Sequence, residues 1–158
     1  MTDRASYARS ARERADALYA GARTPHRSCG IALAETFGLP TPAYQSLRKG
    51  GITGEGPCGA VAAGTLVLGE LLGDPDPTGA VTPALREAIP RYRTAVAAKI
   101  DGALETACNT RTAPLGEFAG ERRKAYCTRL AAIVAESVAE VLWDLGRPVP
   151  IPPAPWVD

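Results

Sequence analysis

The 158-residue chain is poor in several residue types that common functions require. It has one histidine, aromatic residues make up only 6% of it, and its 18 basic residues nearly balance its 17 acidic ones. A dedicated nucleic-acid binder depends on excess positive charge, usually on a basic surface interleaved with aromatic side chains. The sequence therefore predicts a protein that does not bind nucleic acid.

Long apolar runs are also missing. The longest uncharged apolar stretch, residues 57–69, is too short to cross a bilayer. The first 21 residues carry charges every few positions and have no apolar core of a signal peptide. We therefore expect no membrane insertion and a cytoplasmic location. The length predicts one domain, residues 1–147, followed by a proline-rich tail, residues 148–158, which we expect to be extended.

The four cysteines do not form close pairs, because Cys29, Cys58, Cys108 and Cys127 are far apart in sequence. Without a C-x-x-C pair, a thioredoxin motif, a c-type haem attachment site and the paired ligands of a zinc ribbon are excluded. In a reducing cytosol such thiols are buried, metal-bound or redox-active. Cys29 and Cys127 fall on apolar helical faces, where plain core packing is an equal alternative.

Helical periodicity and helix-capping residues predict an all-α bundle of about five to six helices. Three Thr-Pro pairs, which begin at Thr24, Thr41 and Thr82, suit helix starts, and glycines follow several of the patterns as C-terminal caps. We expect Pro90 to kink or split one helix. Cys108 is expected at the C-terminal end of that helix. The predicted helices cover residues 3–20, 25–37, 42–49, 57–72, 83–107 and 117–145.

A glycine-rich loop precedes the small-residue helix that carries Cys58. Four glycines fall within residues 50–57, and Pro57 suits the first helical position. The positive end of a helix dipole lowers the pKa of a thiol, so we expect Cys58 to be the most exposed and reactive cysteine. A phosphate-binding loop is the weaker alternative, since no Lys-Ser/Thr pair follows the glycines.

The order of these features resembles the C-GCAxxG-C-C family of proteins described as redox-active. The matching stretches are "SCGIALAETFG", "KGGITGEGP" with "CGAVAAG", Cys108 and "AYCTRLAAIVAESVAEVL", and they cover roughly residues 25–142. A related module occurs in split-Soret-type cytochromes, where the cysteines are linked with an iron–sulfur cluster. The resemblance implies one site built from all four cysteines.

Three functions remain open at this point. In the first, Cys29, Cys58, Cys108 and Cys127 are ligands of an iron–sulfur cluster for electron transfer, or of zinc in the same place. In the second, Cys58 is the attacking thiol of a metal-free thiol–disulfide switch. In the third, the protein is a non-catalytic helical partner of an oxidoreductase. An oxidoreductase or redox protein is the expected partner in each case, and a homodimer is compatible with the sequence.

Other residues have weaker claims to a function. The basic residues near Cys58 and Cys127 suit either the surroundings of an anionic cluster or a solvated face. We expect His26 to be a surface residue in the first turn of its helix and Glu55 to be a solvent-facing carboxylate. The basic residues considered are Lys49, Arg122, Arg123, Lys124 and Arg129.

Overall fold

The computed structural model describes residues 2–117 and 119–153, which fold into helices and contain no strand. The predicted all-α class is confirmed. The helices are α1 (Arg4–Ala20), α2 (Cys29–Thr36), η1 (Pro42–Leu47), α3 (Arg48–Gly51), α4 (Gly59–Leu72), α5 (Pro83–Ala97), α6 (Cys108–Thr112), η2 (Ala113–Leu115) and α7 (Glu121–Asp144), where η marks a 3₁₀ helix.

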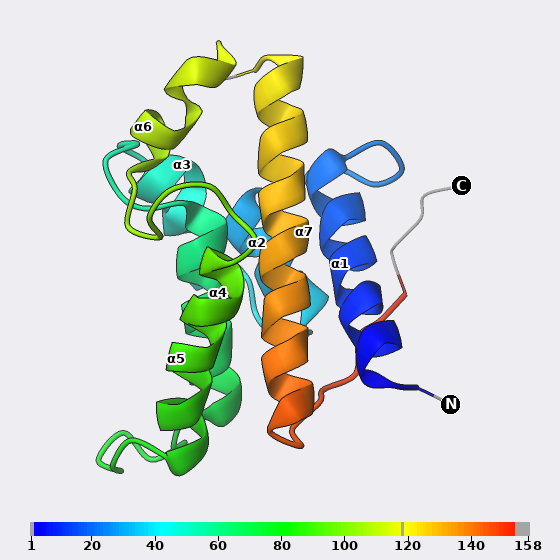
Figure 1. Cartoon of the computed structure of the whole chain (residues 1–158), viewed down its shortest axis with the longest axis vertical. Helices are drawn as coiled ribbons and strands as arrows, with labels where there is room; N and C mark the ends of the chain where they lie inside the picture. The colour runs from blue at the N-terminus through cyan, green and yellow to red at the C-terminus, as the bar shows by residue number, and fades with distance from the viewer. Residues whose placement is uncertain (1, 118, 154–158) are drawn as a thin grey trace.

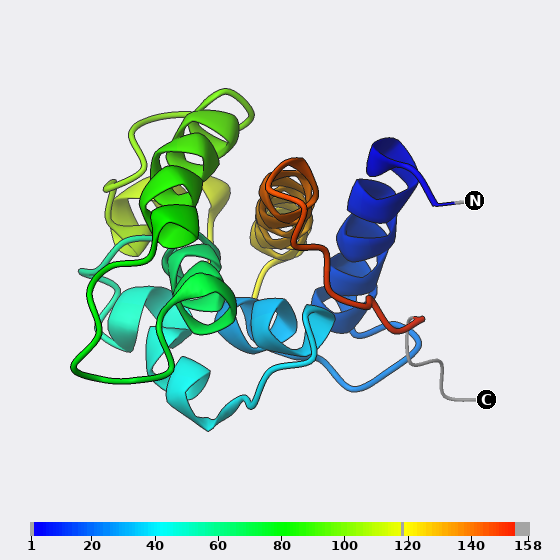
Figure 2. The same ribbon diagram turned by 90° about the horizontal axis from the view of Figure 1, so that it is seen from below.

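The long helix α7 runs through the middle of the molecule. Helix α1 packs along one side of it, α4 and α5 lie on the other side, and α2 crosses beneath (Figures 1 and 2). Buried residues recur every three or four positions along α7, so its apolar stripe faces these neighbours. The α7 stripe comprises Leu130, Val134, Val138, Val141 and Leu142.

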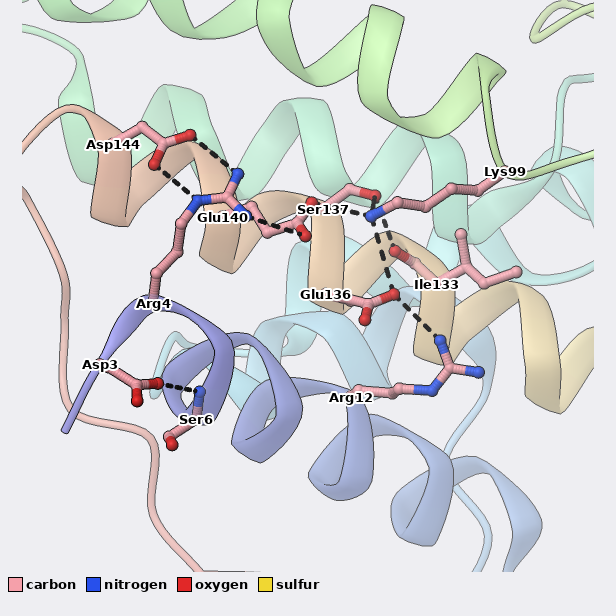
Figure 3. Close-up of polar contacts among 10 residues, drawn as sticks. All are labelled: Asp3, Arg4, Ser6, Arg12, Lys99, Ile133, Glu136, Ser137, Glu140 and Asp144. Atoms are coloured by element: carbon pink, nitrogen blue, oxygen red, sulfur yellow. Dashed lines mark hydrogen bonds and ion pairs between the residues drawn. The ribbon is translucent and has the colours of Figure 1, made fainter.

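Ion pairs along one edge of α7 hold two other segments against it. Figure 3 shows Arg4 and Arg12 reaching from α1 to carboxylates of α7, namely Asp144 and Glu136. Lys99, just beyond α5, donates to Glu140 at 2.8 Å. The network fixes α1 and the end of α5 on α7, with the modest energy typical of partly exposed pairs.

Two of the Thr-Pro predictions hold and one is wrong. Thr82 caps α5, because its hydroxyl accepts a hydrogen bond from the backbone N–H of Leu85. Pro42 begins a short 3₁₀ helix, as expected for residues 42–49. The helix predicted from residue 25 begins instead at Cys29, because the hydroxyl of Thr24 accepts from Arg27 and holds residues 24–27 as a loop. His26 therefore precedes its helix.

The prediction for residues 83–107 is also wrong. Helix α5 ends at Ala97, and Gly102 has a φ of 72°, a left-handed conformation that interrupts a helix. Cys108 consequently opens the separate helix α6. Pro90 does not split α5, because it lies on the exposed face, where water can satisfy the carbonyl that proline leaves unpaired.

The described part of the tail follows α1. The hydroxyl of Tyr7 donates to the carbonyl of Val149 at 2.7 Å and accepts from its N–H at 2.9 Å. Val149 and Ile151 also pack on the core. The rest of the predicted extended tail, residues 154–158, lies outside the described residues. Among the helices of residues 2–117 and 119–153, none is long and apolar enough to cross a bilayer.

Candidate cofactor site

All four cysteines line a single cavity. Cys29 is the first residue of α2, Cys58 is the N-cap of α4, Cys108 is the first residue of α6, and Cys127 lies in the second turn of α7. Helices α4, α6 and α7 begin at the same end of the molecule (Figure 1). The cavity there has a volume of about 600 Å³. Four thiols that are distant in sequence thus border the same cavity.

Short backbone pairing connects two of the cysteine-bearing segments. The N–H of Cys108 donates to the carbonyl of Gly56 at 2.8 Å, and the N–H of Asn109 donates to that of Gly54 at 2.9 Å. Pro57 and Ala107 form an isolated antiparallel bridge. The glycine-rich loop is therefore fixed against the start of α6, which places Cys58 and Cys108 in adjoining segments.

Two glycines allow the backbone to approach the cysteines closely. A Cβ atom on Gly59 would lie 2.6 Å from the Sγ atom of Cys29, and one on Gly50 would lie 2.5 Å from the Cβ atom of Cys108. Gly50 also has a φ of 60°. Side chains at these two positions would displace the thiols, so part of the glycine richness serves packing around the cysteines.

The burial of the cysteines overturns the expectation for Cys58. Cys58 and Cys108 are buried, whereas Cys29 and Cys127 are half-buried, so Cys58 is not the most exposed thiol. Burial raises the pKa of Cys58, although the N–H groups of Val61 and Ala60 at the start of α4 act in the opposite direction. Desolvation outweighs the helix start because the sulfur lies within the protein.

The half-buried thiols are also held in the protonated form. Burial, together with neighbouring Cys58, raises the pKa of Cys29 to about 12. Burial raises the pKa of Cys127, opposed by a hydrogen bond with Tyr19 and by the positive charge of Arg123. Without a bound metal or other cofactor, these two residues are therefore neutral thiols at neutral pH.

The cavity wall is positively charged. None of the described residues that line it is a carboxylate, and five are basic: Arg48, Lys49, Arg111, Arg123 and Lys124. The buried guanidinium of Arg123 donates to the Sγ atom of Cys108 at 3.7 Å. Such a wall favours an anionic occupant.

Arg111 and Ser28 bring further polar groups to this wall. The side chain of Arg111 is only 2% exposed, and it donates to the backbone carbonyls of Asp101 and Ala103. Its Nε atom and the hydroxyl of Ser28 are buried and have no hydrogen-bond partner among the described residues. Both residues line the cavity. Unsatisfied buried donors are costly, which is consistent with a site whose occupant accepts hydrogen bonds.

Sequence reasoning found only part of this wall. Lys49, Arg123 and Lys124 line the cavity, but Arg122 and Arg129 do not. Arg129 lies instead over the ring of Tyr126. The exposed residue His26 was expected at the surface, and it also borders the cavity. Glu55 is exposed and does not border the cavity.

Several wall residues were missed: Tyr19, Ser28, Arg48 and Arg111. Two of them are linked to a cysteine by the sequence: Ser28 directly precedes Cys29, and Arg111 follows Cys108 by three residues, about one helical turn.

The donor set does not suit one metal ion. Among residues 2–117 and 119–153, no three side chains of histidine, cysteine, aspartate or glutamate are grouped so that they could hold a metal ion. The structure therefore gives no support to the zinc alternative, which needs three or four ligands around one atom. The four thiols nevertheless line the same cavity, which is the observation that a larger, shared group would require.

Searches of protein-family models, curated protein sequences and solved structures return no match to this chain. The resemblance to the C-GCAxxG-C-C family therefore stays a prediction, which rests on the four cysteines and the glycine-rich loop.

Proposed function

We propose that the four cysteines hold an iron–sulfur cluster and that the protein transfers electrons to or from an oxidoreductase partner. The observation that carries this proposal is the single cavity that all four cysteines of the chain line, each from a different helix. Four thiolates are the usual ligand set of [2Fe–2S] and [4Fe–4S] clusters. When bound, such a cluster supplies reversible one-electron chemistry.

The electrostatics of the cavity support an anionic group of this kind. A cluster with four thiolate ligands carries net negative charge, and the wall offers five cations and no described carboxylate. The starts of α2 and α4 add the positive ends of two helix dipoles beside Cys29 and Cys58. The buried guanidinium of Arg111 gains a neighbouring negative charge when the thiols become thiolates, which offsets part of its desolvation cost.

The protein's own groups make uptake of the cluster dependent on pH. Burial keeps Cys29, Cys58 and Cys127 protonated, so binding must release their protons. Uptake is therefore favoured as the pH rises. Cys29 and Cys127 are the more exposed pair, so the face that bears them is where a redox partner approaches most closely.

Anaerobic reconstitution with ferrous iron and sulfide tests the proposal. We expect a brown protein with visible charge-transfer absorption, and stoichiometric iron and sulfide per chain. Serine variants of Cys29, Cys58, Cys108 and Cys127, made singly, should each lose or alter this spectrum. The variant Thr128→Ser, beside Cys127 in α7, is the matched control and should reconstitute as the wild type does. A colourless wild-type protein would rule the cluster out.

A metal-free dithiol is the second candidate, and one contact favours it. The Sγ atom of Cys29 lies against Gly59, the neighbour of Cys58, so these two cysteines are the natural disulfide partners. Oxidation of iron-free protein, followed by peptide mapping, should then yield a Cys29–Cys58 disulfide. A different pairing, or four free thiols after oxidation, contradicts this candidate.

A further inference from the structure

The wall of the cysteine cavity is layered by burial. Cys58, Cys108, Arg111 and Arg123 are buried and form what we call the floor. Cys29 and Cys127 are half-buried, so their exposure is intermediate between that of the floor and that of the exposed rim. The exposed residues that line the cavity form what we call the mouth, and its charged or titratable members are His26, Arg48, Lys49 and Lys124.

The mouth carries positive charge of its own, in addition to the charges of Arg111 and Arg123 in the floor. Arg48 and Lys49 come from α3, and Lys124 comes from the first turn of α7, so the cations belong to separate segments of the chain. None of the described residues that line the cavity is a carboxylate. A concave site with low-dielectric walls and one sign of charge concentrates ions of the opposite sign.

We propose that the mouth binds a small organic anion, held through its carboxylate or phosphate oxygens by Arg48, Lys49 and Lys124 beside Cys29 and Cys127. This inference rests on the proposed function and extends it by naming the class of small molecule that approaches the cysteine site. Tyr19, Ala20 and Leu130 also line the cavity and offer apolar surface to the body of such a molecule.

The shape of the site favours a small molecule over a protein surface. Small-molecule sites are concave and typically enclose about 300–1,000 Å³, and this cavity of about 600 Å³ lies within that range. A stable protein interface instead buries about 800 Å² on each partner and is much flatter. The innermost cysteines lie at the buried end of the cavity, where an opposing protein surface would not contact them.

Two alkylating reagents that differ in charge test the inference on the iron-free, reduced protein. Iodoacetate and iodoacetamide react with the same thiolate. A raised thiol pKa slows both reactions by the same factor, and this factor cancels in the ratio of their rates. We expect the folded protein to prefer anionic iodoacetate at Cys29 and Cys127 by about tenfold over the same chain unfolded in urea. Sodium chloride should reduce this preference, because the mouth cations are exposed. Mass spectrometry reports each cysteine separately.

Charge reversal supplies the matched comparison. The double variant Lys49→Glu with Lys124→Glu should abolish the preference for iodoacetate. The double variant Arg86→Glu with Arg147→Glu alters two exposed arginines that do not line the cavity and should leave it unchanged. Equal preferences in folded and unfolded wild-type protein, or an equal effect of both double variants, overturn the inference. These rates need no cluster, so a failed reconstitution and a failed anion preference are separate results.

Discussion

At the scale of single residues, the site depends on glycines, which have no side chain, as well as on the cysteines. Gly59 leaves room for the thiol of Cys29, and Gly50 leaves room for Cys108. Gly64, later in α4, leaves room for Tyr92, whose hydroxyl donates to the carbonyl of Val61. Small residues therefore determine how closely the segments approach one another, both at the cavity and in the core.

Replacing Gly59 should disturb the cysteine site directly. In Gly59→Ala the new methyl group would overlap the Sγ atom of Cys29 and the carbonyl of Leu47, and one of these partners is rigid backbone. We expect a loss of about 1–3 kcal/mol in the free energy of unfolding, together with impaired cluster uptake. Urea unfolding and anaerobic reconstitution measure the two effects.

Gly69→Ala is the matched control for that substitution. Gly69 lies in the same helix, and no atom lies within 4 Å of where its Cβ would be. Alanine is the better helix former, so we expect a gain of about 0.5–1 kcal/mol and unchanged uptake. If Gly59→Ala behaves like Gly69→Ala, the thiol of Cys29 does not occupy the position described.

Cys29 should make the iron-free protein less stable in alkali. Burial raises its pKa from an ordinary 9.0 to about 12, so above pH 9 the unfolded chain releases a proton that the folded chain retains. Stability is therefore complete below pH 9 and is lost as the pH rises toward 12. Between pH 9 and 10 we expect about 1 kcal/mol of additional loss relative to Cys29→Ala. Urea unfolding at each pH measures this difference, and parallel pH profiles would contradict it.

At the scale of helices, the N-terminal ends of the helices position the thiols, because three of the four cysteines lie at or next to a helix start. Thr82 and Asp3 cap α5 and α1 through their side chains. In contrast, the helices that begin at the cavity have no side-chain cap. Their first N–H groups lie at the level of the sulfurs, and those of Ala60 and Val61 act to lower the pKa of Cys58 against the larger effect of burial.

Helix α5 offers a test of how a proline is accommodated inside a helix. Pro90 lies within the helix on its exposed face, where it removes one backbone hydrogen bond. Pro90→Ala should restore that bond and stabilise the protein by about 1–2 kcal/mol, after allowing for the greater freedom of the unfolded chain. Pro83→Ala, at the first helical position, should give no gain, because proline is favoured there. Thermal unfolding of both variants distinguishes the positions, and equal gains would contradict this explanation.

The sequence predicted helices where periodicity and capping agreed, and failed where a local contact decided the conformation. Thr82-Pro83 marked a true helix start, whereas Thr24-Pro25 did not, because local hydrogen bonds from Arg27 to Thr24 and Pro25 hold that segment as a loop. The apolar periodicity after Ala97 continued past the end of α5. The ten residues 98–107, with Gly102 at a φ of 72°, are not helical and separate α5 from the helix that begins at Cys108.

At the scale of the whole molecule, the cysteines were identifiable from the sequence but their environments were not. Their number and their placement around a glycine-rich loop suggested one site. The balance between a helix start and burial at Cys58 depends on tertiary packing, which no local pattern records. The same is true of Arg111, whose burial follows from the carbonyls of Asp101 and Ala103. Sequence reasoning therefore found the four thiols and three of the five basic residues that line their cavity.

The arrangement of helices around one cavity predicts that a bound cluster stabilises the whole molecule. Helices α2, α4, α6 and α7 each contribute a cysteine to the cavity, and α6 is only five residues long. A group that binds the folded chain alone stabilises it by about 2.7 kcal/mol at a hundredfold excess over its dissociation constant. For a chain of this size that corresponds to a rise of about 5–10 °C in the melting temperature.

Calorimetry of the reconstituted and iron-free proteins measures this rise, and hydrogen exchange locates it. Exchange should slow most in residues 98–117, because most of this segment lies outside the long helices: α6 contacts α3 and the glycine-rich loop, and side-chain pairs join the rest to α5 and α7. Cys108→Ser removes the link between α6 and the cluster, so it should retain part of the thermal gain and lose the local protection. If melting rises without protection at residues 98–117 in the wild type, iron binds elsewhere and the four sulfurs do not share one group.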